Sequence, residues 1–188
     1  MFISVLDLFK IGIGPSSSHT LGPMVAAYNF INDIQDQKLS ESSLNDAFIR
    51  CTLKGSLAFT GKGHSTDRAV VLGLHGYQPA LLAKKDVTGL IEQLWKSDHI
   101  RMDKSRRILF KPDEHIIFDK GETLAEHPNG MVFDLIDRNN KILTTETYFS
   151  IGGGFISALA EINQLKPRLK WNPLLCANIR LIRQTLCY

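Results

Sequence analysis

The spacing of hydrophobic residues predicts an amphipathic helix in the first fifth of the chain. The helix is expected to begin near Gly22 and Pro23, because proline suits a first helical turn, and to run to about Asp36. Residues at helical spacing form its apolar face, and they are Met24, Ala27, Tyr28, Ile31 and Ile34. A polar segment rich in hydroxyl groups, residues 12–20, precedes this helix.

A second glycine-rich polar segment, residues 60–67, also precedes an apolar stretch. Residues 69–76 read as a compact helix with Ser65 or Thr66 as its N-cap and Gly76 as its stop signal. Apolar residues at 47–53 indicate a strand before this segment. We therefore expect both polar segments to be loops that lead into helix N-termini, the second one directly after a strand.

The rest of the pattern predicts further strands and one more helix. The helix covers residues 86–97, and two short strands, at 108–110 and 115–118, are parted by Pro112 and Asp113. A hairpin is expected from strands at 131–136 and 142–149, because the intervening asparagines tolerate left-handed turn geometry. Residues 2–10 fit a strand or a helical turn equally well. The elements together predict an α+β fold, a small mixed or antiparallel sheet with packed helices.

Charge is distributed unevenly along the 188 residues. The net charge is +3, but residues 1–150 carry 17 Lys/Arg against 18 Asp/Glu, and residues 151–188 carry 5 against 1. The main body is therefore not expected to bind nucleic acid. No apolar run reaches the length of a membrane span, and no secretory signal is visible, so we expect a soluble, cytoplasmic protein without a membrane partner.

The three cysteines, Cys51, Cys176 and Cys187, are an odd number without a close pair. They provide neither a disulfide framework nor a metal site, so we expect reduced and mostly buried thiols.

Both polar segments contain side chains that are able to bind a ligand or transfer a proton. Ser16 to Thr20 contribute hydroxyl groups and His19 beside a helix start, where backbone N–H groups suit a carboxylate or phosphate, although hydroxyl runs also simply cap helices. His64 lies two residues before the second helix, where the positive end of the helix dipole disfavours an added proton. A neutral imidazole can act as a base, and Lys62 adds positive charge in the same sense. Asp67 is able to accept backbone N–H bonds or to orient a histidine.

Two further motifs carry weaker signals. The run Gly152, Gly153 and Gly154 offers only close backbone approach or hinge freedom, and it matches no nucleotide-binding fingerprint. His127 and Asn129 are expected in a turn before the hairpin. From the residues alone, the chemistry extends to a small-anion site with a neutral histidine base.

Four stretches, in order, carry a resemblance to a known family. They are SVLDLFKIGIGPSSSHTLGPM at 4–24, GSLAFTGKGHSTD at 55–67, HPNGM at 127–131 and YFSIGGGFI at 148–156. They resemble the β domain of the bacterial iron-sulfur L-serine dehydratases, or L-serine ammonia-lyases, best in the single-chain members. That β domain is similar to the allosteric substrate-binding domain of some phosphoglycerate dehydrogenases.

The resemblance implies an activity and its cofactor. Such enzymes convert L-serine to pyruvate and ammonia by eliminating water, a step in amino-acid degradation that feeds gluconeogenesis. A helical α domain holds a 4Fe-4S cluster through three cysteines, its open iron acts as a Lewis acid, and no pyridoxal phosphate is used. The resemblance also implies that His64 is the catalytic base. It implies substrate or domain-interface contacts from Ser16, Ser17, Ser18, His19, Thr20, Lys62, Gly63, Asp67, Asn129, Gly152, Gly153 and Gly154.

The resemblance ends at residue 156. We expect residues 1–156 to form the β domain and residues 157–188 to form a basic tail outside the family pattern, with any amphipathic helix around Leu174 limited by Pro167 and Pro173. We therefore expect this chain to lack the cluster-binding α domain, which its own cysteines cannot replace.

These features predict an incomplete enzyme, either a truncated product or a divergent subunit. It should be inactive without a cluster-bearing α domain or subunit, and the complete enzyme is a possible homodimer. The alternatives are a degenerate, non-catalytic module that binds small anions, and an amino-acid-sensing regulatory module.

Overall fold

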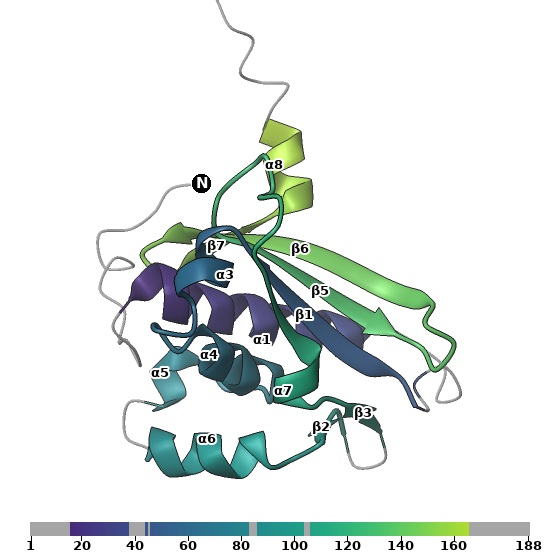
Figure 1. Cartoon of the computed structure of the whole chain (residues 1–188). Coiled ribbons are helices and arrows are strands. Elements are labelled where there is room, and N and C mark those ends of the chain that lie inside the picture. The colour runs from purple at the N-terminus through teal and green to yellow at the C-terminus, as the bar shows by residue number, and fades with distance from the viewer. Residues whose placement is uncertain (1–15, 38–43, 45, 83–85, 104–105, 166–188) are drawn as a thin grey trace, which may run out of the picture.

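The computed structural model describes residues 16–37, 44, 46–82, 86–103 and 106–165 of the chain. Over these residues a mixed sheet is covered by several helices (Figure 1). After a π-helical turn, Ser17–Leu21, the elements are α1 (Gly22–Asp36), β1 (Phe48–Lys54), α3 (Ser56–Thr60), α4 (Thr66–Leu74), α5 (Pro79–Leu82), α6 (Val87–Trp95), β2 (His99–Arg101), β3 (Arg107–Leu109), α7 (Pro112–His115), β4 (Ile116–Asp119), β5 (Gly130–Ile136), β6 (Ile142–Gly152), β7 (Phe155–Ala158) and α8 (Leu159–Leu165).

The sheet combines parallel and antiparallel pairs. Its strand order is β2-β3-β1-β5-β6-β7, and β4 also pairs with β1. β1 runs parallel to β3 and β4 and antiparallel to β5, while β5, β6 and β7 form an antiparallel meander. Along β1, the alternate residues Ile49, Cys51 and Leu53 are fully buried, as expected for a strand with one face on the core. The predicted α+β class is confirmed.

α1 and α4 lie side by side against the sheet (Figure 1). Met24, Ala27, Ile31 and Ile34, four of the five residues predicted for the apolar face of α1, are buried, and Tyr28 is half-buried. At Gly73 the two helices touch through their backbones, because a Cβ there would overlap the carbonyl oxygen of Met24 and the methyl group of Ala27. This contact fixes the spacing between the segments that precede the two helices.

α6 packs on the outside of α4. Its apolar residues Leu90, Ile91 and Leu94 contact a small buried cluster that includes Leu72 and Leu82. Asp86 caps α6 by accepting a hydrogen bond from the backbone N–H of Gly89. The helix predicted at 86–97 is therefore confirmed, with slightly tighter bounds.

The predicted hairpin is confirmed as β5 and β6, and Asn140 has the left-handed conformation expected in its turn, with φ 61°. β1, β3 and β4 fall where short strands were predicted. Cys51 is a free, buried thiol whose pKa is raised by burial. The segment 2–10, the tail beyond residue 165, Cys176 and Cys187 lie outside the described residues.

Two local predictions are wrong. Residues 17–21 form a π-helical turn that continues into α1, because consecutive helical hydrogen bonds extend back to Ser16. α3 intervenes between β1 and the second glycine-rich segment, so that segment does not follow a strand directly. Ser65 is the N-cap of α4, as predicted, but its backbone has a left-handed φ of 57° and its side chain makes no capping bond, whereas capping side chains normally accompany extended backbone.

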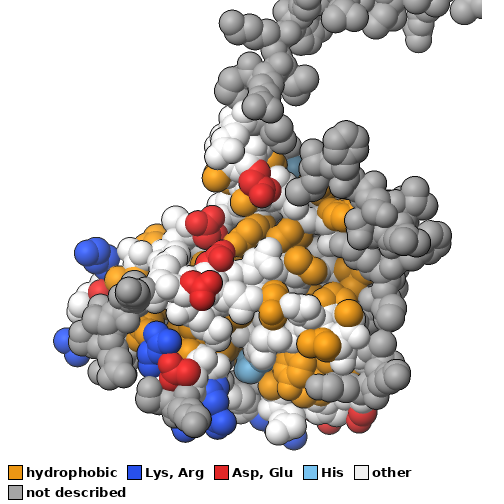
Figure 2. Space-filling model, turned by 180° about the vertical axis from the view of Figure 1, so that it is seen from behind, with side chains coloured by type: hydrophobic (Ala, Val, Ile, Leu, Met, Phe, Trp, Pro, Cys, Tyr) orange, Lys and Arg blue, Asp and Glu red, His pale blue; other side chains and the backbone are white. Residues whose placement is uncertain are grey.

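The next feature is the distribution of charged and hydrophobic side chains on the surface. Seen from behind, acidic and basic side chains lie mainly on the left and along the lower edge, hydrophobic ones lie mainly at the centre and right, and no large part of the visible, described surface is uniformly basic (Figure 2). Within the same described part of the chain, no helix has the length and hydrophobicity needed to cross a bilayer.

Candidate active site

His19 lies in the π-helical turn that leads into α1, and hydroxyl groups hold its ring on both sides. Its Nδ1 lies 3.0 Å from Ser18 Oγ and its Nε2 lies 3.1 Å from Ser56 Oγ. Ser16 Oγ accepts a hydrogen bond from the His19 backbone N–H and lies 3.3 Å from Ser18 Oγ. The ring is therefore fixed from two separate elements, the turn itself and the start of α3.

The environment of His19 favours its neutral form. Burial lowers the pKa of His19 below its ordinary value of 6.5, and the nearby His64 lowers the pKa further, whereas a hydrogen bond to Ser56 raises it. The net direction is downward, so His19 is uncharged near neutral pH.

His64 stands beside His19, although it belongs to a different loop. The two ring centroids are 4.9 Å apart and the ring planes are inclined by 53°. His64 Nδ1 is buried and has no hydrogen-bond partner among the described residues. The backbone of His64 is held in a tight turn, because its N–H donates to the carbonyl of Gly61, as does the N–H of Thr66. Two motif histidines thus share one site.

Two threonines tie these histidines together by reciprocal bonds. Thr66 Oγ1 donates to the His19 carbonyl oxygen at 2.6 Å, and Thr20 Oγ1 donates to the His64 carbonyl oxygen at 3.1 Å. In a regular helix the His19 carbonyl would accept from Pro23, which has no N–H. Thr66 satisfies that carbonyl instead, and both threonines are buried. We call this pair of bonds the threonine clamp.

Thr66→Val should lower the free energy of unfolding by about 1–3 kcal/mol, because a buried carbonyl loses its donor while the side-chain volume is kept. Urea unfolding of the 188-residue chain measures the change, and Thr66→Ser should recover most of the loss. Thr60→Val is the matched control: Thr60 is exposed and donates to the Ser56 carbonyl within α3, so its effect should stay within about 0.5 kcal/mol. Equal effects at Thr60 and Thr66 would contradict a special role for the clamp.

A third loop borders the site. The Ser56 N–H donates to the Pro128 carbonyl at 2.8 Å, which joins α3 to the turn before β5. Asn129 Nδ2 donates to the Ser150 carbonyl, and the Ser150 N–H donates to the Asn129 carbonyl. Ser150 Oγ packs against Gly22, is buried, and has no partner within the described residues. Asn129 is therefore linked to the histidines through the backbone rather than by a direct side-chain contact.

Other predicted site residues have different surroundings. Lys62 Nζ lies over the Phe118 ring at 5.5 Å. Asp67 Oδ1 accepts from the Arg68 backbone N–H, and Asp67 lines a surface hollow toward α6, so it does not orient either histidine. Gly152, Gly153 and Gly154 all have positive φ in the turn between β6 and β7, and a Cβ at Gly63 would meet only ordinary contacts. Among the described residues, no hydrogen bond joins these side chains to the rings of His19 and His64.

Sequence reasoning gave no site role to Ser56, Thr66 or Ser150. All three residues lie inside the motifs that carry the family resemblance, which is the available signal, and Thr66 is predicted only as a helix cap. Among the described residues, no group of three His, Cys, Asp or Glu side chains could hold a metal ion. The described part of the chain therefore does not fit an iron-sulfur cluster. Its arrangement suits proton transfer by a histidine held against a neutral neighbour.

The family model and the similar proteins that match this chain all point to the same family. The family model described as serine dehydratase beta chain matches residues 4–161. L-serine dehydratase of Haemophilus influenzae is 41% identical over 155 residues, which cover 82% of this chain and 33% of that protein. The Streptomyces coelicolor L-serine dehydratase is 40% identical, over 83% of this chain and 34% of its own length. L-serine dehydratase 1 of Escherichia coli is 38% identical, over 82% and 33% respectively. The chain thus spans about a third of the length of these relatives.

Proposed function

The chain belongs to the serine dehydratase β-chain family, and from this premise we propose that it supplies one side of an L-serine ammonia-lyase active site. The reaction would convert L-serine to pyruvate and ammonia, once a cluster-bearing α domain or subunit completes the site. The observation that carries the proposal is the pairing of His64 with a neutral, hydroxyl-bound His19 at 4.9 Å. L-serine and the α domain are the proposed partners, in a cytoplasmic lyase that degrades an amino acid.

His64 is the proposed base for the α-proton of L-serine. The electrons of the broken Cα–H bond form a Cα=Cβ bond while hydroxide leaves Cβ, and transfer of the proton from the His64 imidazolium to that hydroxide gives 2-aminoacrylate, water and the neutral base. Tautomerisation to the imine and hydrolysis then give pyruvate and ammonia. His64 suits the task because no described side chain occupies its ring nitrogens as a hydrogen-bond partner, in contrast to His19.

His19 is proposed to position and protect this base. It stays uncharged because burial and the neighbouring ring lower its pKa. The proton that His64 accepts is therefore not opposed by a second imidazolium 4.9 Å away. Ser16 and Ser18 act through His19 by hydrogen bonding, and Thr20 acts on the backbone of His64, so these three residues build the site rather than bind the substrate carboxylate.

The remaining candidates are proposed as contacts with substrate or with the α domain. Ser17 is the exposed hydroxyl of the turn. Lys62, Gly63 and the glycine turn at 152–154 lie on loops, where binding residues are common. Asn129 is held beside the site through its bonds to Ser150. These assignments extend the family pattern to positions whose side chains do not touch the histidines.

The proposed cofactor is a 4Fe-4S cluster held by cysteines of the α domain, without pyridoxal phosphate. When bound, such a cluster supplies Lewis acidity toward a departing hydroxide. This chain's proposed part is proton removal, orientation of the base and substrate-side contacts, because its described residues include no cluster of three His, Cys, Asp or Glu side chains that could hold a metal ion.

Complementation tests the proposal. The 188-residue chain is mixed anaerobically with the part of the Haemophilus influenzae L-serine dehydratase that follows the matched region, and pyruvate formation from L-serine is measured. Each component alone should be inactive, and the mixture should release pyruvate. Binding of L-serine by the chain without any restored turnover would instead favour a regulatory module.

A further inference from the structure

A polar cavity lies at the far end of α4 from the threonine clamp. Its volume is about 450 Å³, and the ends of α4 and α6 and the β2–β3 pair form its walls. α4 begins at Thr66 beside the histidines, and the residue that follows its last turn, His75, lines this cavity. The cavity therefore uses a different set of side chains from the candidate active site.

Two arginines face each other in this cavity. Arg101 of β2 and Arg107 of β3 occupy directly opposite positions of an antiparallel pair, so their side chains lie on the same face, and both line the cavity. Like charges at such positions repel and destabilise the pair. Neither guanidinium has a hydrogen bond or ion pair with the described residues, whereas the adjacent Arg106 is paired with Asp103 at 2.6 Å. The repulsion between Arg101 and Arg107 is thus left uncompensated.

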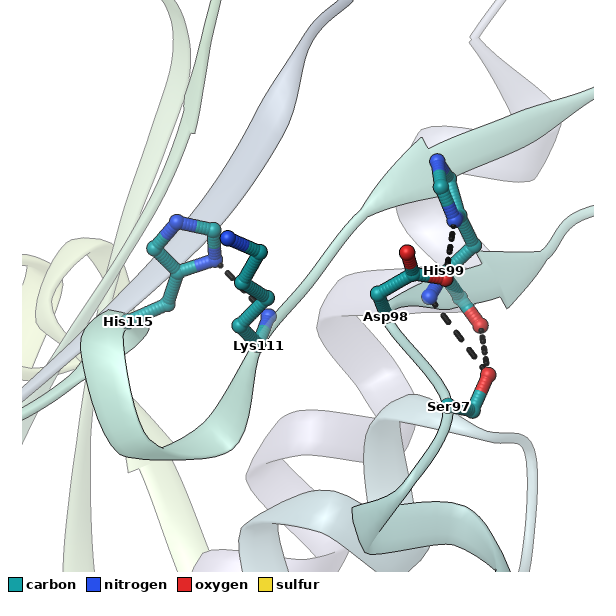
Figure 3. Close-up of polar contacts among 5 residues, drawn as sticks. All are labelled: Ser97, Asp98, His99, Lys111 and His115. Carbon is teal, nitrogen blue, oxygen red and sulfur yellow. Dashed lines mark hydrogen bonds and ion pairs between the residues drawn. The ribbon is translucent and has the colours of Figure 1, made fainter.

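The one carboxylate that lines the cavity is already engaged. Asp98 Oδ1 accepts a hydrogen bond from His99 Nδ1 at 2.6 Å, while Ser97 Oγ donates to the His99 carbonyl oxygen (Figure 3). The Asp98 carbonyl also accepts from the Phe110 N–H at 2.8 Å. These bonds fix the Ser97–His99 turn and hold Asp98 on its own histidine. Asp98 is thus the one carboxylate in the described lining, and it pairs with His99 and with neither arginine.

We infer that this cavity is a binding site for a small organic anion, whose phosphate or carboxylate group is held between Arg101 and Arg107. Two guanidinium groups supply paired N–H donors that match such oxyanions, and the bound charge removes their mutual repulsion. The volume exceeds that of the anionic group alone and lies in the range of small-molecule sites. Leu94 and Tyr77 provide a less polar wall for the carbon skeleton. The inference does not depend on the proposed reaction, because it uses none of the residues assigned to it.

Isothermal titration calorimetry of the 188-residue chain tests the site, with inorganic phosphate and succinate as separate probes at constant ionic strength. At least one probe should bind saturably with one site per chain. Tighter binding of phosphate would identify a phosphate ester as the ligand class, and tighter binding of succinate a carboxylate. The double variant Arg101→Gln, Arg107→Gln should weaken binding about tenfold or more.

Arg138→Gln is the matched control, since it removes one exposed positive charge in the β5–β6 turn, and its affinity should match the parent chain. Equal weakening by the control would show general charge attraction and overturn the site, as would the absence of saturable binding.

Thermal unfolding gives an independent readout. Without an added anion, Arg107→Gln should melt at the same or a higher temperature than the parent chain, because one repelling charge is gone. With phosphate or succinate present, the parent chain should gain more in melting temperature than the variant. A lower melting temperature of the anion-free variant would mean that Arg107 serves the fold itself, and would overturn the inference.

Discussion

His64→Ala, assayed after complementation with the cluster-bearing part of a relative, should lower kcat for L-serine deamination by a factor of about 10² to 10⁴, the usual contribution of a positioned base. KM should change little, because the imidazole acts on the proton and does not hold the carboxylate. The ring contacts His19 at 4.9 Å and makes no side-chain hydrogen bond within the described residues, so its removal should leave the fold intact. Circular dichroism of the chain and cluster absorbance of the mixture check this point.

Hydrogen exchange isolates the proton-transfer step. In D2O the complemented parent chain should replace the α-proton of L-serine with deuterium or eliminate water. The complemented His64→Ala variant should carry out both reactions much more slowly than the parent chain. Arg138→Ala, at an exposed turn position, serves as the control and should retain parental kcat. Turnover near the parental level in His64→Ala would remove His64 from the role of base and direct attention to another group.

Gly73→Ala should cause the largest loss of stability, about 3 kcal/mol in the free energy of unfolding measured with urea. The added Cβ would overlap the Met24 carbonyl oxygen and the Ala27 methyl group, and it would approach the Tyr28 nitrogen at 3.0 Å. Backbone atoms cannot move aside as a flexible side chain can, so α1 and α4 must separate. Because His19 lies in the turn that leads into α1 and His64 lies two residues before α4, the same separation should weaken the threonine clamp.

Gly63→Ala provides the comparison for Gly73→Ala. Its Cβ would meet only the Thr60 carbonyl oxygen, at 3.5 Å, which is an ordinary contact, so stability should change by less than about 0.5 kcal/mol. If Gly73→Ala were as stable as Gly63→Ala, the helices could adjust without cost, and the spacing of the two histidines would not depend on their close approach.

Local sequence patterns were sufficient to predict the longer helices and strands. The apolar spacing of α1 and the turn residues of the β5–β6 hairpin act over a few neighbouring residues, and both elements appear where they were predicted. The short helices α3 and α7 were missed, since four or five residues carry no periodicity. The turn at Ser17–Leu21 was missed because hydroxyl-rich segments suit loops and caps as well as helices.

The site residues, too, were only partly predictable from the sequence. Motif composition was enough to single out His19 and His64, and the family resemblance in the same motifs is confirmed by the match over residues 4–161. The motifs did not show that the Thr66 hydroxyl would reach back 47 positions to the His19 carbonyl, or that Ser56 would hold the His19 ring. Those contacts exist only because α1 and α4 pack against each other and α3 follows β1.

The sequence by itself therefore determined the family, the fold class and the principal helices and strands, and it indicated the two histidines as candidates. Tertiary structure decided which hydroxyl groups serve each histidine, that Asp67 faces α6 instead of the site, and that Arg101 and Arg107 meet without a partner among the described residues. The physical reason is the distance along the chain over which each kind of interaction acts. Helix periodicity and turn chemistry act over a few residues, whereas hydrogen bonding and charge pairing at a site depend on distances that close only when distant segments pack together.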